Sequence, residues 1–154
     1  MRVESPAFNE GGAIPAKHTC EGEDTAPPLR FHDVPKDAKS LVLLVDDPDA
    51  PDPKAPRRVW LHWLVWDLPP DTKELPEGGR PLPPGATEAT NDSGDVGYGG
   101  PCPPIGRHRY FFKLFALDTL LGLPGSAKRA DVEKAMEGHV LAQAQVMGTY
   151  EKAR

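Results

Sequence analysis

Short runs of alternating apolar and polar residues recur along the chain, and proline or glycine separates each run from the next. Four of these runs predict β-strands, over residues 29–34, 40–46, 58–68 and 109–118. A shorter edge strand is expected over residues 5–8. Residues 40–46 are almost wholly apolar, which predicts a strand that is buried on both faces. The whole pattern indicates a mainly β fold with long, stiff loops.

The segment 58–68 contains all three tryptophans, so its strand is expected at the centre of the core. Successive side chains of a strand point to opposite faces of the sheet. One face should therefore carry His62 with Trp60, Leu64 and Trp66, and the other face Leu61, Trp63, Val65 and Asp67.

The remaining segments are less regular. Residues 69–97 are rich in proline and glycine, which predicts a long segment with little secondary structure. Gly125 and Ser126 offer an N-cap for a helix over residues 127–138. Residues 142–150 alternate again and predict a final strand, with a continuous helix through Gln145 as the alternative.

The length of 154 residues suits one domain that spans residues 1–154. A formal net charge of −5 argues against a nucleic-acid-binding protein, because such proteins present a basic surface. No apolar run is long enough to cross a membrane, and the first residues lack the pattern of a signal peptide. We therefore expect a cytoplasmic protein that is not an integral membrane protein.

Cysteine and proline usage adds two expectations. Cys20 and Cys102 would be reduced in a cytosol, and their number alone does not decide whether they form a disulfide. The 19 prolines restrict the unfolded chain, which predicts a thermostable protein.

Candidate chemistry is concentrated in residues 97–110, which are glycine-rich, then proline-rich, then basic and aromatic. Gly99 and Gly100 can present backbone N–H groups to an anion, although no Walker sequence is present. His108 and Tyr110 are two residues apart in a strand, so their side chains should project to the same side. Arg107 and Arg109 are therefore expected at the surface or paired with acids.

Asp47 and His62 are expected to complete an anion-binding pocket. Asp47 follows a buried strand, and next to His62 it could hold the imidazole in one tautomer or keep it charged. Asp49 is expected to cap the local turn. This set favours a binding protein over an enzyme and predicts no cofactor.

Three alternatives remain open. Cys102 with His62 or His108 and Asp47 would form a cysteine-dependent hydrolase, although no helix N-terminus lowers the pKa of this thiol. His62, His108, Asp47 and Asp49 could instead hold a metal ion. A purely structural role for the His–Asp pair is the third alternative.

Several motifs together resemble the phosphatidylethanolamine-binding protein family, also called the Raf-kinase-inhibitor-like family, and its bacterial branch in particular. The motifs are Asp47-Pro48-Asp49-Ala50-Pro51, Trp60-Leu61-His62-Trp63, Gly97 through Pro104, and Gly106 through Tyr110. The resemblance extends over nearly the whole chain, with further matches at Ser5-Pro6-Ala7-Phe8 and Gly138-His139-Val140.

The resemblance implies a Greek-key β-sandwich with one or two short helices and a small anion-binding pocket at one end. It implies a ligand such as phosphate, a phospholipid head group or a carboxylate, a role as a kinase or protease modulator or inhibitor, and a homodimer. The family's ligand-binding positions correspond to Asp47, His62, Gly100, His108 and Tyr110, and its pocket-shaping positions to Asp49, Pro51, Trp60, Pro101 and Cys102.

Overall fold

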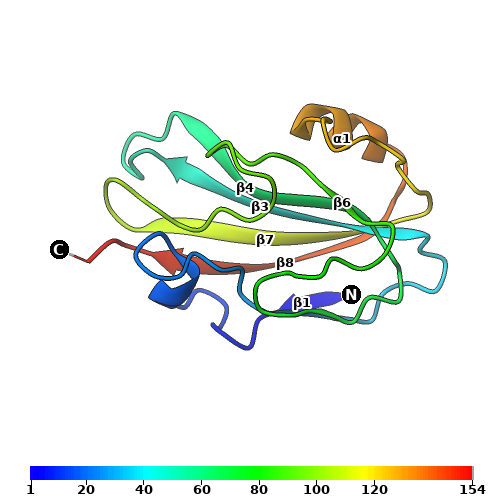
Figure 1. Ribbon diagram of the computed structural model, residues 1–154, viewed down its shortest axis with the longest axis horizontal. Coiled ribbons are helices and arrows are strands. Elements are labelled where there is room, and N and C mark those ends of the chain that lie inside the picture. Colours follow the sequence, from blue (N-terminus) through cyan, green and yellow to red (C-terminus); the bar gives the residue numbers. More distant parts are fainter. Residues whose placement is uncertain (154) are drawn as a thin grey trace.

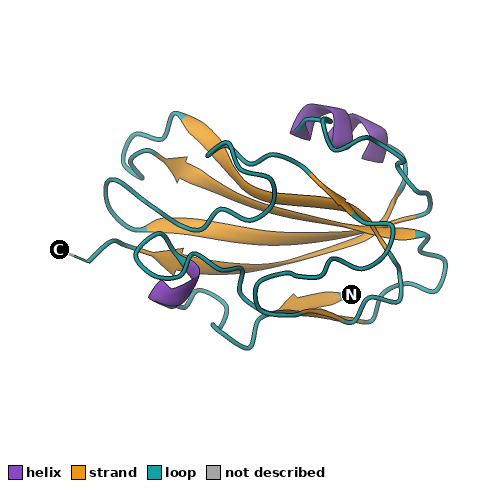
Figure 2. Cartoon of the chain, in the orientation of Figure 1, coloured by secondary structure: helices purple, strands orange, loops and turns teal. Residues whose placement is uncertain are grey.

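The computed structural model describes residues 1–153, which form two antiparallel sheets and one α-helix (Figures 1 and 2). The smaller sheet has the order β1-β2-β5, with β1 at Arg2–Glu4, β2 at Leu29–His32 and β5 at Glu74–Leu75. The larger sheet has the order β6-β4-β3-β7-β8. Its strands are β3 (Ser40–Ala50), β4 (Arg58–Leu68), β6 (Thr87–Glu88), β7 (His108–Leu117) and β8 (Val140–Tyr150).

The larger sheet contains a Greek key. β3, β4 and β6 pair consecutively, and the chain then returns to place β7 on the free side of β3. This spatial order is that of four Greek-key strands. The predicted mainly β fold and its sandwich architecture are therefore confirmed.

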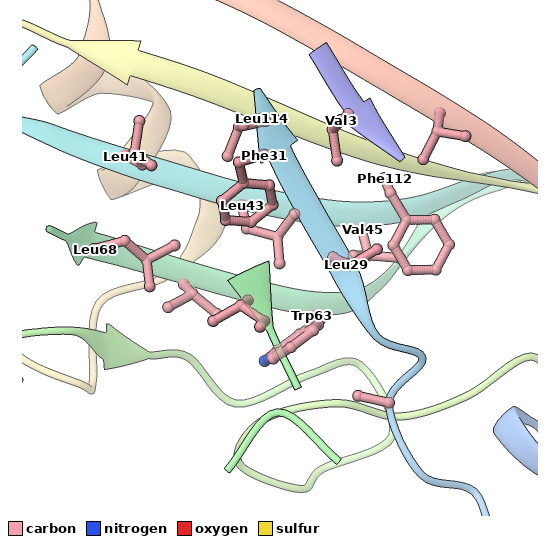
Figure 3. Close-up of a cluster of buried hydrophobic side chains, with 14 of the residues drawn as sticks. Val3, Leu29, Phe31, Leu41, Leu43, Val45, Trp63, Leu68, Phe112 and Leu114 are labelled. Carbon is pink, nitrogen blue, oxygen red and sulfur yellow. The ribbon is translucent and has the colours of Figure 1, made fainter. Parts of the chain in front are cut away.

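Two apolar clusters lie on the two faces of the larger sheet. One cluster fills the space between the sheets, where Leu29 and Phe31 of β2 pack against β3 and β4 (Figure 3). The other lies under helix α1 (Arg129–Met136), which covers part of the opposite face (Figure 1). β3 is consequently buried on both faces, as its apolar run predicts, and Leu41, Val42 and Leu43 have no exposed surface.

The four main predicted strands and the predicted final strand exist, but their ends differ from the prediction. β3 continues beyond residue 46 to Ala50, and β8 begins at Val140. Ala142, Ala144 and Val146 of β8 face the inner cluster, which excludes the alternative of a continuous helix through Gln145.

Two further predictions, the edge strand and the start of the helix, are wrong. Residues 5–8 form a tight turn closed by a single Ser5–Phe8 bridge, and the edge strand lies earlier, at β1. The N–H of Ala127 donates to the Pro124 carbonyl in a turn, so the helix begins at Arg129. A short 3-10 helix, η1 (Ala16–His18), was not predicted.

We expect Gly148→Ala to lower the free energy of unfolding by about 1–3 kcal/mol, since it overpacks the core. An added Cβ atom would lie 2.6 Å from Cγ1 of Ile14 and 2.8 Å from Cε2 of Phe8. Gly125→Ala is the matched control, because its Cβ atom would lie 3.7 Å from the nearest atom, in Thr87. Urea unfolding measures both variants, and equal losses would contradict this account of the packing.

Candidate functional site

A cavity of about 250 Å³ lies at the end of the larger sheet where β3 ends and β4 and β7 begin. We call this cavity the end pocket. Eight of the ten predicted site residues line it: Asp47, Pro51, Trp60, His62, Gly100, Cys102, His108 and Tyr110. The three neighbouring strands and the loop before β7 thus bring together residues that are distant in sequence.

A β-bulge in β4 sets the position of His62. Val45 of β3 pairs with Trp63, and the next residue, Asp46, pairs with Leu61. His62 is therefore an extra residue without a partner in the ladder. A bulge of this kind interrupts the alternation of side chains between the two faces.

The bulge turns His62 toward the inner face of the sheet. Leu61 and Leu64 both pack in the cluster under α1, although they are three residues apart. The His62 ring instead lies 5.2 Å from the Tyr110 ring, in an edge-to-face arrangement. The predicted placement of His62 on the same face as Leu64 and Trp66 is therefore wrong.

The His62 imidazole has one engaged nitrogen and one free nitrogen. Nδ1 lies 2.6 Å from the carbonyl oxygen of Gly99. Because a carbonyl can only accept, Nδ1 carries the proton. Nε2 is buried and has no hydrogen-bond partner in the protein. Burial lowers the pKa of His62, so near neutral pH the ring is uncharged and Nε2 is an acceptor.

Tyr110 supplies a donor to the same cavity. Its side chain is only 1% exposed, and its hydroxyl has no hydrogen-bond partner in the protein. Burial raises the pKa of Tyr110, so the hydroxyl keeps its proton. The end pocket therefore contains a buried donor and a buried acceptor that have no partner in the protein, on residues from two different strands.

Asp47 and His108 form a buried ion pair beside these two groups. Nδ1 of His108 lies 2.6 Å from Oδ2 of Asp47, and Nε2 lies 2.9 Å from the carbonyl oxygen of Ile105. Each ring nitrogen faces an acceptor, so the imidazolium form satisfies both. The expectation that Asp47 orients His62 is therefore wrong, since Asp47 binds His108. Both ring nitrogens of His108 are also occupied by the protein.

Comparison with known proteins agrees with this architecture. The sequence profile described as phosphatidylethanolamine-binding protein matches residues 4–151. The chain belongs to the phosphatidylethanolamine-binding protein family. A UPF0098 protein of Methanothermobacter thermautotrophicus is 49% identical, with 99% of both chains covered. The resemblance inferred from the motifs is confirmed.

Crystal structures of two similar proteins share the fold of this chain. A homologue from Chlamydia trachomatis has a TM-score of 0.91 at 43% identity, with 99% of this chain and 97% of that chain covered. Escherichia coli YbcL, described as a new member of the mammalian family, has a TM-score of 0.88 at 33% identity, with 99% of this chain and 98% of that chain covered.

Asp49 and Pro101, which were predicted to shape the pocket, do not line it in this family member. The Asp49 carboxylate binds the Arg109 guanidinium through two contacts of 2.9 Å, and Arg109 lowers the pKa of Asp49. The local turn is capped instead by Asp47, whose Oδ1 accepts the N–H of Asp49 at 2.7 Å. The carbonyl of Pro101 accepts the N–H of Cys20.

The glycines of the loop before β7 do not present free N–H groups. The N–H of Gly99 donates to the carbonyl of His62 at 2.9 Å, and that of Gly100 donates to Oδ1 of Asp24 at 2.8 Å. The predicted anion cradle of backbone N–H groups is therefore wrong. Gly100 lines the end pocket but has no free backbone donor.

Cys20 and Cys102 form a disulfide. Cys102 lines the end pocket, but it has no thiol to act as a nucleophile. The alternative of a cysteine-dependent hydrolase is therefore not supported. The disulfide answers the question that the number of cysteines left open.

The metal-site alternative has no support in residues 1–153, where no three His, Cys, Asp or Glu side chains are grouped to hold a metal ion. Asp49 is turned toward Arg109, and Asp47 is bonded to His108. Within the same residues, no helix is long and apolar enough to cross a membrane.

Four residues of the lining were not predicted: Ala50, Ser93, Pro103 and Pro104. Three of them lie inside the motifs that carry the family resemblance, so the motifs contained the signal. Ser93 lies in the segment expected to have little regular structure, and nothing in its sequence context connects it with β4 or β7.

Proposed function

We propose that this protein binds a small oxyanion such as phosphate in the end pocket. The hydroxyl of Tyr110 donates a hydrogen bond to an oxygen of the ligand, and Nε2 of His62 contacts a second oxygen. The Asp47–His108 ion pair keeps the adjoining wall rigid and balanced in charge, and Pro51, Trp60 and Cys102 limit the size of the ligand.

One observation supports this proposal most strongly. Two buried polar atoms without a protein partner, Nε2 of His62 and the hydroxyl of Tyr110, belong to side chains that line one cavity. Leaving such an atom without a hydrogen bond costs about 1–3 kcal/mol. A ligand that bonds to both atoms recovers this cost, whereas a purely structural site would gain nothing from the arrangement.

We expect Tyr110→Phe to weaken the binding of inorganic phosphate about tenfold, because it removes one hydrogen bond to a charged ligand. Isothermal titration calorimetry at pH 6 measures the effect. Tyr150→Phe is the matched control, since its hydroxyl bonds to Glu21 outside the pocket, and it should bind like the wild type. In NMR spectra phosphate should shift the imidazole signals of His62 and leave those of the exposed His139 unchanged. If His62 does not respond to millimolar phosphate, the proposal is wrong.

The broader expectations extend the same proposal. A phospholipid head group, or a phosphorylated or carboxylate group of a partner kinase or protease, would enter the same pocket, so that the protein acts as a modulator or inhibitor. A homodimer, a cytoplasmic location and high thermostability remain predictions. Light scattering, cell fractionation and thermal unfolding test these three in turn.

A further inference from the structure

We infer that the end pocket selects oxyanions that carry a hydroxyl proton, such as the monoanion of a phosphomonoester, over oxyanions that carry none. This inference rests on the proposed function and names its ligand class. Two buried side-chain atoms of its lining have no partner in the protein: a donor, the hydroxyl of Tyr110, and an acceptor, Nε2 of His62. A phosphomonoester monoanion has both a P–OH group and unprotonated oxygens, so it satisfies both atoms. A phosphodiester or a sulfate ester offers acceptors only.

The backbone fixes the acceptor nitrogen of His62 in place. Nδ1 of His62 donates to the carbonyl of Gly99, and the N–H of Gly99 donates back to the carbonyl of His62. These two bonds, of 2.6 and 2.9 Å, hold ring and loop together. These bonds prevent a flip of the imidazole ring, which would swap the positions of Nδ1 and Nε2. Nε2 therefore remains the nitrogen that faces a ligand.

The surroundings of His62 do not favour its charged form. The ionisable groups that face it come from β3, β7 and the loop after β6: Asp46, Asp47, His108, Tyr110 and Asp92. Each carboxylate already has a cationic partner: Asp47 pairs with His108, Asp46 with Lys113 and Arg129, and Asp92 with Arg58. No carboxylate is left to balance an imidazolium, and burial lowers the pKa of His62. An oxygen of an anion that carries no proton would thus face the lone pair of Nε2, and these two acceptors cannot form a hydrogen bond with each other.

The decisive experiment compares methyl phosphate with methyl sulfate by calorimetry at pH 5. Methyl phosphate is chiefly a monoanion there, because the second pKa of a phosphomonoester is about 6. The two probes then have the same charge and nearly the same shape, and they differ by one proton. We expect methyl phosphate to bind at least about tenfold more tightly, since only it can donate to a buried acceptor.

The outcomes separate this inference from the proposed function. Equal affinities, or tighter binding of methyl sulfate, would contradict the inference that the pocket selects oxyanions with a hydroxyl proton. The proposed function of anion binding would still stand. If neither probe binds, the proposed function itself fails. Tyr110→Phe should weaken both probes to a similar extent and preserve their ratio, because the hydroxyl of Tyr110 bonds to an unprotonated oxygen that both probes possess.

A spectroscopic measurement tests the position of the proton directly. In the methyl phosphate complex at pH 5, the ¹⁵N signals of His62 should remain those of a neutral ring protonated at Nδ1. An imidazolium pattern in this complex would contradict the inference, even if methyl phosphate binds more tightly.

Two further probes distinguish the sources of the ligand. Dimethyl phosphate models the diester of a common phospholipid head group and should bind as weakly as methyl sulfate. Dihydrogen phosphate should bind about as well as methyl phosphate, because it also has a P–OH group. Tight binding of dimethyl phosphate would favour a lipid diester and overturn the inference.

Discussion

Replacing both cysteines with serine is expected to lower the free energy of unfolding by about 4.5 kcal/mol, an entropic cost set by the length of the loop that the bond closes. The disulfide joins Cys20 to Cys102 across a sequence separation of 82 residues. The unfolded chain with this bond has far fewer conformations than the chain without it. The loss is measured by urea unfolding of the wild type and the double variant, both without reductant.

The reductant itself provides the control for this prediction. Adding it to the wild type should reproduce the loss, because both cysteines are exposed to solvent. Adding it to the double variant should change nothing. A double variant within about 1 kcal/mol of the oxidised wild type would show that the bond does not restrict the unfolded chain as we expect.

We expect Asp47→Ala to lower the free energy of unfolding by about 3–5 kcal/mol, the range for a buried ion pair that loses one partner. His108 is only 1% exposed, and its Nδ1 would face no acceptor. The N–H of Asp49 would also lose its acceptor. Urea unfolding at pH 7 measures the loss.

A second Asp–His pair in the chain is a matched control for burial. Oδ1 of Asp118 lies 2.7 Å from Nδ1 of His139, but both side chains are almost half exposed. Asp118→Ala should therefore cost less than about 1 kcal/mol. Similar losses for the two variants would mean that burial does not set the strength of the Asp47–His108 pair.

The strands could be predicted because their apolar periodicity is local. The end of β3 could not, because a proline such as Pro48 disfavours the continuation of a strand in a sequence pattern. In the structure this proline lies where the pairing with β4 shifts register, between Asp47–Trp60 and Ala50–Arg58. A strand tolerates proline at such an irregularity, because the missing N–H is not needed for the ladder. The end of β3 therefore depends on its register with β4, and the sequence of β3 alone does not determine that register.

The grouping of the candidate residues was largely predictable, whereas their hydrogen bonds were not. The motifs group Asp47, His62, His108 and Tyr110, and these four residues line one cavity. The bulge that turns His62 inward depends on the register of β3 against β4. The N–H of Gly100 is occupied by Asp24, a residue 76 positions away. Contacts of this kind arise only once the strands are paired, so local patterns carry no signal for them.

The Greek key has a consequence for the newly synthesised chain. β3 and β4 are adjacent in sequence, but the other edge of β3 pairs with β7, which ends at Leu117. At about 5–20 residues per second, a ribosome needs about 3 to 13 s to progress from the end of β3 to the end of β7. During that time an apolar strand has one unpaired edge, a template for pairing with other chains. The nascent hairpin is therefore the stage at which we expect chaperones to protect this protein.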